Sequence, residues 1–303
     1  MPVTVGAKDR RRVGQRAEAQ TADFRNLGKL GIREQVAVAS MVLTDFRSTL
    51  QTLAKTAPDE IYNLAGQTSV GLSFEQPVET LESIATGTLN LLEAIRFLDR
   101  PIRLYNAGSS ECFGDTGGVA ANEDTPFRPR SPYAVAKSSA HWLVTNYRES
   151  YGLYACTGIL FNHESPLRPK RFVTQKIIQA AKRIAGGSAE RLTLGRLDIR
   201  RDWGWAPEYV DAMWRMLQQP SPSDFVIATG ESHTLAEFVE AAFAANGLDW
   251  TRYVDSSESL FRPTDIARSQ GDPERARTKL GWVAVTKMRS VVEKMIRSET
   301  LSC

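Results

Sequence analysis

The sequence predicts an α/β fold, a doubly wound parallel sheet with a smaller, mixed C-terminal lobe. Between residues 34 and 162, short apolar runs rich in β-branched residues alternate with amphipathic stretches of helical period. Polar residues follow these runs directly, at the strand ends where such sheets bind ligands. Beyond residue 165 the alternation loosens and helical stretches dominate.

Composition and net charge limit the classes of function that the sequence indicates. The chain has 303 residues, of which 42% are hydrophobic and 24% charged, as in soluble globular proteins. A net charge of +3 is too small to indicate a nucleic-acid or membrane partner. No run of about 18 apolar residues is present.

Cysteine usage and the N-terminus predict a cytoplasmic location. Cys112, Cys156 and Cys303 form no Cys-x-x-Cys pair, which predicts a reducing compartment without disulfides, zinc or another metal site. No apolar core of a secretory signal is found. Residues 1–23 form an atypical basic leader, interpreted as a basic arm, a transit-like segment or a poorly ordered start.

The predicted N-terminal lobe spans residues 24–165. Its first strand, EQVAVASMVL, is expected to be buried, and the next helix ends at Pro58 with Leu50 and Leu53 inward. A strong helix at 78–97 places Leu81, Ile84, Thr88, Leu91 and Ile95 on one stripe. In order, strands are predicted at 34–43, 60–66, 102–108 and 155–162, and helices at 45–57, 78–97 and 133–150.

The remaining residues, 166–303, are predicted to form the smaller C-terminal lobe. Thr234 and Glu237 have the spacing of a capping box at the start of a helix. Asp272 and Pro273 are typical of a helix cap and a first helical position. The helices predicted here are 172–185, 207–218, 234–247 and one that starts at 272.

The stretch SPYAVAK places Tyr133 and Lys137 on one helix face, because they are four residues apart. Alone this spacing is weak, since many exposed helices contain such a pair. Ser131 and Pro132 would start the helix there, and the preceding strand delivers Ser109 and Glu111. A phenol with a pKa of about 10 is a poor base, and a neighbouring ammonium lowers that pKa.

Six segments together carry a resemblance. The chain resembles the extended short-chain dehydrogenase/reductase superfamily, which has a Rossmann-like fold, and within it the GDP-mannose 4,6-dehydratase family. The likeness runs from about residue 24 to residue 297, and the "NHESP" and "RDWG" segments separate it from general sugar-nucleotide epimerases. The segments are YNLAGQTSVGLSFEQP, GSSECFG, SPYAVAK, FNHESP, RRDWGWAPEYVDAMW and FRPTD.

The resemblance implies a hydro-lyase that converts GDP-mannose to GDP-4-dehydro-6-deoxymannose and water, with NADP as a temporary hydride store. Tyr133 would exchange the proton of the 4-hydroxyl, and Lys137 would lower its pKa and hold the nicotinamide ribose. Ser109, where the family usually has threonine, would bind the 4-oxygen. Glu111 would remove the proton from carbon 5.

The resemblance also implies roles for further residues, matched position by position. The resemblance implies cofactor contacts at Leu64, Ala65, Gly66, Gln67, Thr68, His163 and Arg168, besides Tyr133 and Lys137. It implies nucleotide-sugar contacts at Asn162, Lys176, Arg201 and Arg262; a diphosphate favours such cationic side chains. It also implies a homodimer or homotetramer, since members of the superfamily pair through two helices of the N-terminal lobe.

Simpler interpretations remain open for several of these residues. His163 is also consistent with a structural histidine, and Arg168 with an exposed basic loop. Arg201 is also consistent with a surface pair to Asp198 or Asp202. Two other functions stay open as well: a related GDP-sugar reductase or epimerase, and an inactive copy that acts as a binding or assembly partner.

One expected motif is missing. A Rossmann-like lobe begins with a strand, a Gly-x-x-Gly-x-x-Gly loop and a helix that together bind the pyrophosphate. Gly6 and Gly14 have the wrong spacing, and a βαβ unit of about 30 residues does not fit before residue 24. We therefore expect the front of the cofactor lobe to be absent or replaced, through a shifted start or in a degenerate copy. Val42 also stands where many relatives carry an aspartate.

Overall fold

The structure, a computed structural model, describes residues 3–6, 12–16 and 24–297, which divide into two compact units. The first unit contains residues 1–113, 126–159 and 213–225, and the second contains 114–125, 160–212 and 226–303. The chain therefore passes between the units several times. Within the described residues, no helix is long and apolar enough to cross a membrane.

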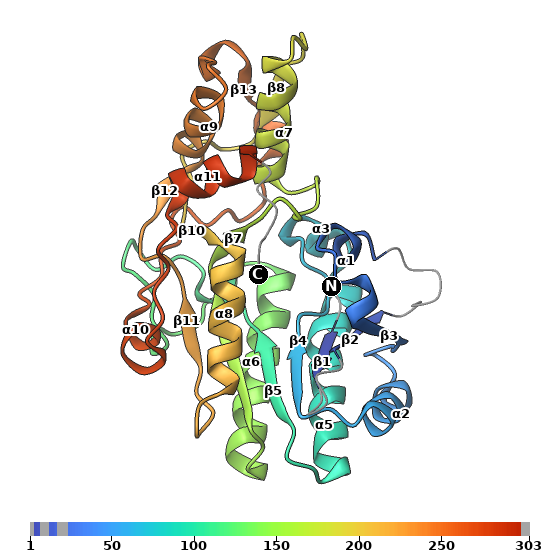
Figure 1. Cartoon of the computed structure of the whole chain (residues 1–303). Coiled ribbons are helices and arrows are strands. Elements are labelled where there is room, and N and C mark those ends of the chain that lie inside the picture. The colour runs from blue at the N-terminus through green and yellow to red at the C-terminus, as the bar shows by residue number, and fades with distance from the viewer. Residues whose placement is uncertain (1–2, 7–11, 17–23, 298–303) are drawn as a thin grey trace. The chain divides into compact units, whose positions relative to one another are not determined.

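The first unit is built on the predicted α/β sheet (Figure 1). A seven-stranded sheet has the order β11-β6-β5-β4-β1-β2-β3. The pairs β4–β5 and β5–β6 are parallel, as expected, and the pair β2–β3 is parallel as well. Its strands are β1 (Val3–Gly6), β2 (Arg12–Arg16), β3 (Val36–Ser40), β4 (Glu60–Asn63), β5 (Arg103–Ala107), β6 (Ala155–Leu160) and β11 (Phe225–Ile227). The division between the two units falls within β11 and before the last residue of β6.

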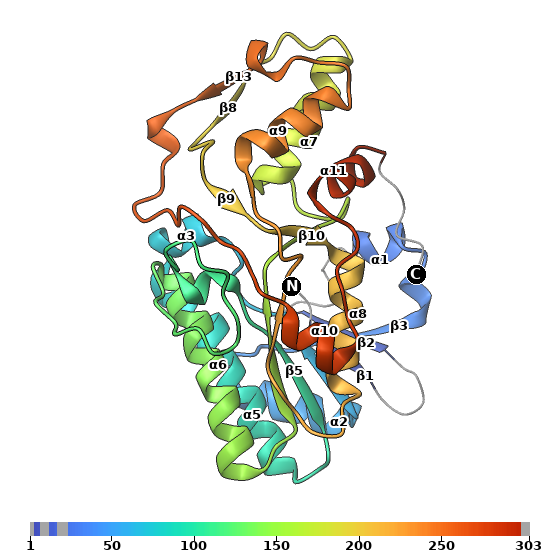
Figure 2. The same ribbon diagram turned by 90° about the vertical axis from the view of Figure 1, so that its left-hand side faces the viewer.

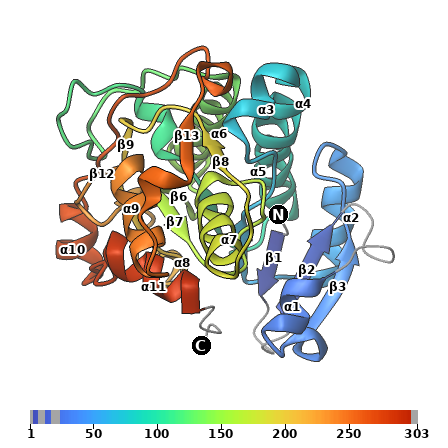
Figure 3. The same cartoon turned by 90° about the horizontal axis from the view of Figure 1, so that it is seen from above.

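Strand β1 interrupts the parallel arrangement, because it runs antiparallel to both of its neighbours, β2 and β4. Figure 3 shows β1, β2 and β3 side by side. Only residues 7–11 separate β1 from β2, whereas a parallel connection needs a dozen residues or more. Part of the basic leader thus forms strands, an outcome that the three interpretations of residues 1–23 did not include.

A strand was expected at 34–43 and is present at Val36–Ser40, but the expectation that it is buried is wrong. Strand β3 is the edge of the sheet, and Val36 is its only buried residue. An edge strand has a neighbour on one side alone, so its side chains stay partly exposed. The following helix α2 (Phe46–Thr56) is confirmed, with Leu53 fully buried and Asp45 capping the backbone N–H groups of Arg47 and Ser48.

The helix predicted at 78–97 is broken by a π-helical turn. Helix α4 (Pro77–Leu81) is followed by the π turn Glu82–Thr86 and by α5 (Gly87–Leu98). A π turn contains one extra residue, which rotates the buried stripe by about 100°. Thr80 is therefore buried and Leu81 is 39% exposed, contrary to the predicted stripe.

Further helices complete the first unit. Helix α6 (Pro132–Tyr151) follows the N-cap Ser131, as the sequence predicts, and α1 (Arg25–Lys29) and α3 (Val70–Glu75) are short. Apolar residues of α2, α5 and α6 pack with those of β4 and β5 in one core. Its fully buried members include Leu53, Ile61, Leu91, Leu92, Leu104 and Val144.

The second unit contains helices α7 (Val173–Ala185), α9 (Leu235–Ala244), α10 (Glu274–Leu280) and α11 (Met288–Arg297). Helices α7, α9 and α11 contact one another (Figure 2). The capping box of Thr234 and Glu237 is confirmed, while α10 begins at Glu274, with Pro273 as its cap. The amphipathic α11 was not predicted, although Met288, Val291, Val292 and Met295 have helical spacing.

Short strands pair in the second unit. They are β7 (Asn162–Glu164) with β10 (Trp203–Trp205), β9 (Arg200–Arg201) with β12 (His233–Thr234), and β8 (Leu192–Leu194) with β13 (Val254–Ser256). Helix α8 (Ala206–Leu217) follows β10 directly, and the division between the two units falls within it.

Candidate active site

The first group of predicted site residues lies at the carboxyl ends of β4 and β5. These strands are parallel neighbours with Asn63 opposite Asn106, so the segments that follow them start at the same edge. Asn63 Nδ2 donates a hydrogen bond of 3.0 Å to Asn106 Oδ1, which links the two strand ends. Residues 64–68 and 108–111 therefore leave the sheet side by side.

Ser109 and Glu111 occupy a tight turn after β5. Gly108 approaches β6 so closely that a Cβ there would lie 2.7 Å from Thr157 Cγ2. Ser109 is buried, and its Oγ accepts a hydrogen bond of 3.3 Å from the backbone N–H of Glu111. Because this oxygen accepts from Glu111, the hydroxyl proton remains available for another acceptor.

Helix α6 positions Tyr133 and Lys137. Ser131 Oγ accepts a hydrogen bond of 3.1 Å from the backbone N–H of Ala134, which starts the helix at Pro132 and puts Tyr133 in its first turn. Tyr133 is partly buried against a small apolar cluster. Lys137 Nζ lies 5.9 Å from the centroid of the Tyr133 ring, so the two side chains share one face, as predicted.

A hydrogen bond ties Lys137 to the end of β5. Lys137 Nζ donates to the carbonyl oxygen of Ala107 at 2.7 Å, and the side chain is 6% exposed. Burial lowers the pKa of Lys137 to about 8. The structure thus brings the Tyr133–Lys137 pair to the strand end from which Ser109 and Glu111 follow.

Residues 64–68 pack on the π-helical turn. Gly66 has a φ of +106°, and a Cβ there would lie 2.7 Å from Ile84 Cγ1, so only glycine fits this approach. The backbone N–H of Gln67 donates to Ser83 Oγ at 3.3 Å, and its side-chain Nε2 donates to the carbonyl oxygen of Ser69 at 2.7 Å. This conformation keeps the backbone of residues 64–68 close to the carboxyl edge of the sheet, where ligands bind in sheets of this kind.

These residues fit one end of a nicotinamide dinucleotide better than the other. The ammonium of Lys137 and the phenol of Tyr133 are donors suited to a ribose and a carboxamide. Strand β1, however, ends at Gly6, which pairs with Glu60 at the start of β4. Its carboxyl end therefore lies at the sheet edge opposite residues 64–68, and the next described element is a strand, not the helix that binds a pyrophosphate.

The second group of predicted residues lies in the second unit, beginning with His163 in β7. His163 Nδ1 lies 2.9 Å from the carbonyl oxygen of Phe161, so Nδ1 carries the proton. Burial, and secondly the positive charge of Arg168, lower the pKa of His163 to about 4. The imidazole is therefore neutral at physiological pH.

Arg168 is anchored, so the interpretation as a freely exposed basic loop is wrong for it. Its Nε lies 3.1 Å from Glu164 Oε2, and its Nη1 donates to the carbonyl oxygen of His163 at 3.0 Å. Glu164 is buried and accepts a further hydrogen bond of 2.8 Å from Thr174 Oγ1. Burial raises the pKa of Glu164.

Arg201 is also buried, which contradicts the interpretation as a surface ion pair. Its Nη1 donates to the carbonyl oxygen of Ile266 at 2.7 Å, and it is 6% exposed. Asp198 instead pairs with Arg196 on the surface, at 2.5 Å. Among the other predicted contacts, Asn162 is half-buried in β7, Lys176 is exposed on α7, and Arg262 is 42% exposed with Nη1 3.9 Å from Asp265 Oδ1.

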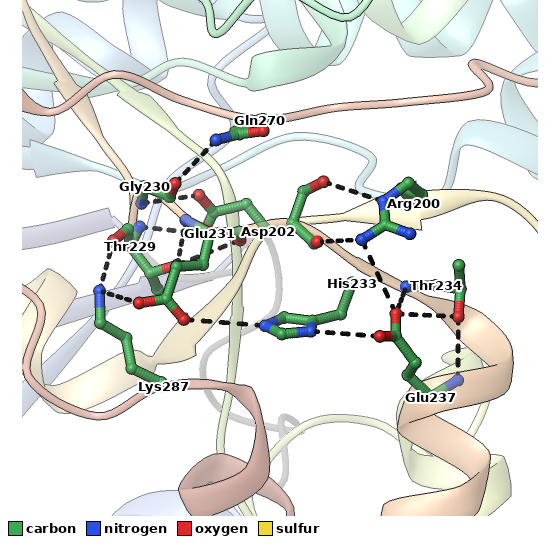
Figure 4. Close-up of polar contacts among 11 residues, drawn as sticks. Arg200, Asp202, Thr229, Gly230, Glu231, His233, Thr234, Glu237, Gln270 and Lys287 are labelled. Atoms are coloured by element: carbon green, nitrogen blue, oxygen red, sulfur yellow. Dashed lines mark hydrogen bonds and ion pairs between the residues drawn. The ribbon is translucent and has the colours of Figure 1, made fainter.

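Asp202, next to Arg201, holds a loop that the sequence did not single out (Figure 4). Its carboxylate accepts from the backbone N–H groups of Thr229 at 2.9 Å and Gly230 at 3.0 Å. Lys287 Nζ holds the other side of this loop through the carbonyl oxygen of Thr229 and an ion pair of 3.3 Å with Glu231. Burial raises the pKa of Asp202 to about 6.

Cys112 is a buried packing residue. Its Sγ lies 3.8 Å from the carbonyl oxygen of Ala134, and burial raises its pKa to about 11. A thiol with a raised pKa is a poor nucleophile, so cysteine chemistry is not indicated here.

Sequence comparison places these residues in a family context. A sequence profile described as GDP-mannose 4,6 dehydratase matches residues 6–295. GDP-mannose 4,6 dehydratase 1 of Arabidopsis thaliana is 49% identical over 84% of this chain and 71% of its own length. The GDP-mannose 4,6-dehydratase of Sinorhizobium fredii (strain HH103) is 46% identical over 85% of this chain and 79% of its own length.

Solved structures have the same fold. UDP-glucose 4-epimerase of Thermus thermophilus, in complex with NAD, aligns with a TM-score of 0.79 at 25% identity over 94% of this chain and 90% of that one. RMD of Pseudomonas aeruginosa, complexed with NADPH, aligns with a TM-score of 0.79 at 22% identity over 94% and 97%. From the profile match and the curated relatives, the chain belongs to the GDP-mannose 4,6-dehydratase family.

Proposed function

We propose that the chain is a hydro-lyase that converts GDP-D-mannose to GDP-4-dehydro-6-deoxy-D-mannose and water, with NADP as its nicotinamide cofactor. The observation that carries this proposal is the hydrogen bond from Lys137 to Ala107. It fixes the phenol–ammonium pair of α6 at the strand end that presents Ser109 and Glu111. Family membership supplies the substrate.

Each side chain has one task in this proposal. Tyr133 takes the proton of the 4-hydroxyl, Lys137 stabilises the phenolate, and Ser109 holds the 4-oxygen by its hydroxyl proton. Glu111 removes the proton from carbon 5, and the 6-hydroxyl accepts that proton and leaves as water. The hydride taken from carbon 4 is returned to carbon 6, and carbon 5 regains a proton from solvent. When bound, the nicotinamide supplies a temporary store for one hydride, so that the overall reaction is redox-neutral.

The second unit would bind the nucleotide sugar and part of the cofactor. Arg201 is supported by its burial and by its fixed position, since its Nη1 donates to the carbonyl oxygen of Ile266, and a guanidinium is a suitable partner for a diphosphate. Asn162, Lys176 and Arg262 are proposed as further contacts to the nucleotide sugar. His163 and Arg168 are proposed as cofactor contacts, together with residues 64–68 of the first unit.

The chemical test is incubation with GDP-mannose and catalytic NADP, followed by NMR of the sugar. We expect a 6-methyl signal and loss of water without accumulation of reduced cofactor. A reductase on the same scaffold would leave GDP-mannose unchanged, because it needs reduced cofactor and a keto sugar. An epimerase would give an isomer of GDP-mannose without loss of water.

One observation favours a second candidate, an inactive subunit that binds GDP-mannose or assembles with another chain. Because β1 runs opposite to β4, the described residues offer no glycine loop and helix for the pyrophosphate at the ligand-binding edge. Calorimetry separates the candidates: micromolar NADP binding supports the enzyme, whereas GDP-mannose binding without NADP binding supports the inactive subunit.

We also propose that the chain forms a homodimer, or a homotetramer built from such dimers, in the cytoplasm. Large apolar side chains are exposed on α5 and α6, with Phe97 at 70%, Trp142 at 59% and Val135 at 41%. Within the described residues, the thiols of Cys112 and Cys156 are buried and free, and the cytoplasmic location is proposed from the sequence. Sedimentation of wild type and Trp142→Glu tests the interface, since the charge should yield monomers.

A further inference from the structure

We infer that Tyr209 is a positioning residue whose ring holds the His163 imidazole in one orientation. His163 lies in β7 and Tyr209 in α8, and their rings are stacked with centroids 4.8 Å apart and planes 24° apart. The inference deepens the proposed function and rests on it in one respect, the assignment of His163 as a cofactor contact. The geometry itself involves residues of the second unit alone.

Gly204 makes the stack possible. It lies opposite His163 in the β7–β10 pair, and a Cβ at this position would be 2.3 Å from Tyr209 Cε2. Such a contact is far shorter than any tolerated carbon–carbon distance, so a larger residue at 204 would displace the ring. The glycine of RDWG therefore leaves the space that the tyrosine of PEYV occupies beside the histidine of NHESP.

The Tyr209 ring is itself held on a second side. Trp282 packs edge-on against it, with centroids 5.8 Å apart and planes 88° apart. Trp282 is fixed in turn, because its Nε1 donates a hydrogen bond of 2.9 Å to the carbonyl oxygen of Glu208. A stack on such a fixed ring restricts the rotation of His163 about its χ angles.

The ring of Tyr209, rather than its hydroxyl, accounts for this role. Tyr209 is fully buried, and its hydroxyl has no hydrogen-bond partner within the part of the chain that the structure describes. An unpaired buried hydroxyl costs free energy, so its removal is expected to be neutral or stabilising. Phenylalanine should therefore replace Tyr209 without loss of positioning, whereas leucine should not.

The stack and one hydrogen bond together define the state of His163. The carbonyl of Phe161 keeps the proton on Nδ1, which leaves Nε2 as the acceptor of a neutral ring. The stack covers one ring face and keeps it from water. Without the stack, the ring is expected to rotate, to gain access to water and to bind a proton more readily.

The experiment measures the tautomer and the titration of His163 in the cofactor-free chain. Long-range ¹H–¹⁵N spectra of histidine-labelled protein would be recorded from pH 5 to pH 8, with the His163 signals assigned through His163→Gln. For wild type and Tyr209→Phe we expect a single Nδ1–H tautomer that does not titrate. For Tyr209→Leu we expect mixed tautomers and titration within this range.

Gly204→Ala provides an independent variant in case Tyr209→Leu folds poorly. Alone it should displace the ring, lower the melting temperature and disturb the His163 tautomer. Combined with Tyr209→Leu, which removes the clash, it should lower the melting temperature much less. Unchanged His163 spectra in Tyr209→Leu and Gly204→Ala would overturn the inference, as would altered spectra in Tyr209→Phe.

Measurements of NADP binding test whether the stack of His163 on Tyr209 affects the cofactor contact. Because an aromatic stack contributes about 0.5–1.5 kcal/mol, Tyr209→Leu should weaken NADP binding roughly two- to tenfold and leave GDP-mannose binding unchanged. Equal weakening of both ligands would contradict the positioning role. Since the spectra are recorded without cofactor, failure of the dehydratase proposal would leave their outcome unaffected.

Discussion

Lys137 Nζ donates a 2.7 Å hydrogen bond to the carbonyl oxygen of Ala107 and thereby joins α6 to the end of β5. The Tyr-x-x-x-Lys spacing alone does not indicate this contact, because it concerns a backbone atom 30 residues earlier in the chain. The contact brings Tyr133 and Lys137 to the strand end from which Ser109 follows.

Lys137→Met should abolish turnover without unfolding the chain. Burial lowers the pKa of Lys137 to about 8, so the folded chain binds its proton less tightly than the unfolded chain, whose lysine titrates near 10.5. The stability of the wild type should therefore rise, relative to Lys137→Met, as pH increases from about 8 to about 10.5. Urea unfolding of the cofactor-free proteins measures this difference; a difference that is constant with pH would contradict the buried charge.

Glu111→Gln should remove the loss of water. The amide cannot accept the carbon-5 proton, and loss of a general base lowers kcat by about 10²- to 10⁴-fold. Glu149→Gln, an exposed substitution on α6, is the matched control and should retain wild-type turnover. Full activity of Glu111→Gln would show that another group is the base.

Comparison of Ser109→Thr with Ser109→Ala tests the role of the hydroxyl, because threonine keeps it and alanine lacks it. Threonine keeps the hydroxyl, so its kcat should remain near that of the wild type. Alanine removes the donor to the 4-oxygen and should lower kcat by roughly tenfold or more, with a smaller effect on KM. Steady-state kinetics decide the matter, and equal rates for Ala and Thr would exclude a role for the hydroxyl.

Asp202→Asn should destabilise the second unit by about 1–3 kcal/mol. The fully buried carboxylate accepts from the N–H groups of Thr229 and Gly230, and an amide nitrogen cannot accept. Asp198→Asn, at an exposed ion pair, should change the free energy of unfolding by less than about 1 kcal/mol. Denaturant unfolding compares the two variants; equal effects would show that the carboxylate does not hold this loop.

The sequence predicted the fold through local signals, and these were strongest within single elements. Burial periodicity located β4, β5, α2 and α6, and the capping residues Ser131 and Thr234 are confirmed. The predicted burial was wrong where it depends on the position of an element in the sheet or on a break in a helix. Strand β3 is exposed because it lies at the sheet edge, and Leu81 is exposed because the π turn shifts the helix phase.

The placement of the proposed catalytic residues was predicted from the sequence, whereas their supporting contacts were not. The positions of Tyr133, Lys137, Ser109 and Glu111 follow from strand order and helix start, which the sequence signals. The anchoring role of Asp202 depends on a loop 27 residues away, which no local pattern indicates. Glu164 and Arg168 are only four residues apart, but they lie outside a helix, where this spacing does not predict a contact. The direction of β1 was equally hidden, since it follows from the short connection to β2.

The most direct measurement of the central claim is the conversion of GDP-mannose by the purified, folded chain with added NADP. We expect a 4-keto-6-deoxy product with a 6-methyl resonance, the loss of one water per sugar, and no such product from Glu111→Gln. A folded chain that binds GDP-mannose and NADP yet forms no such product would contradict it.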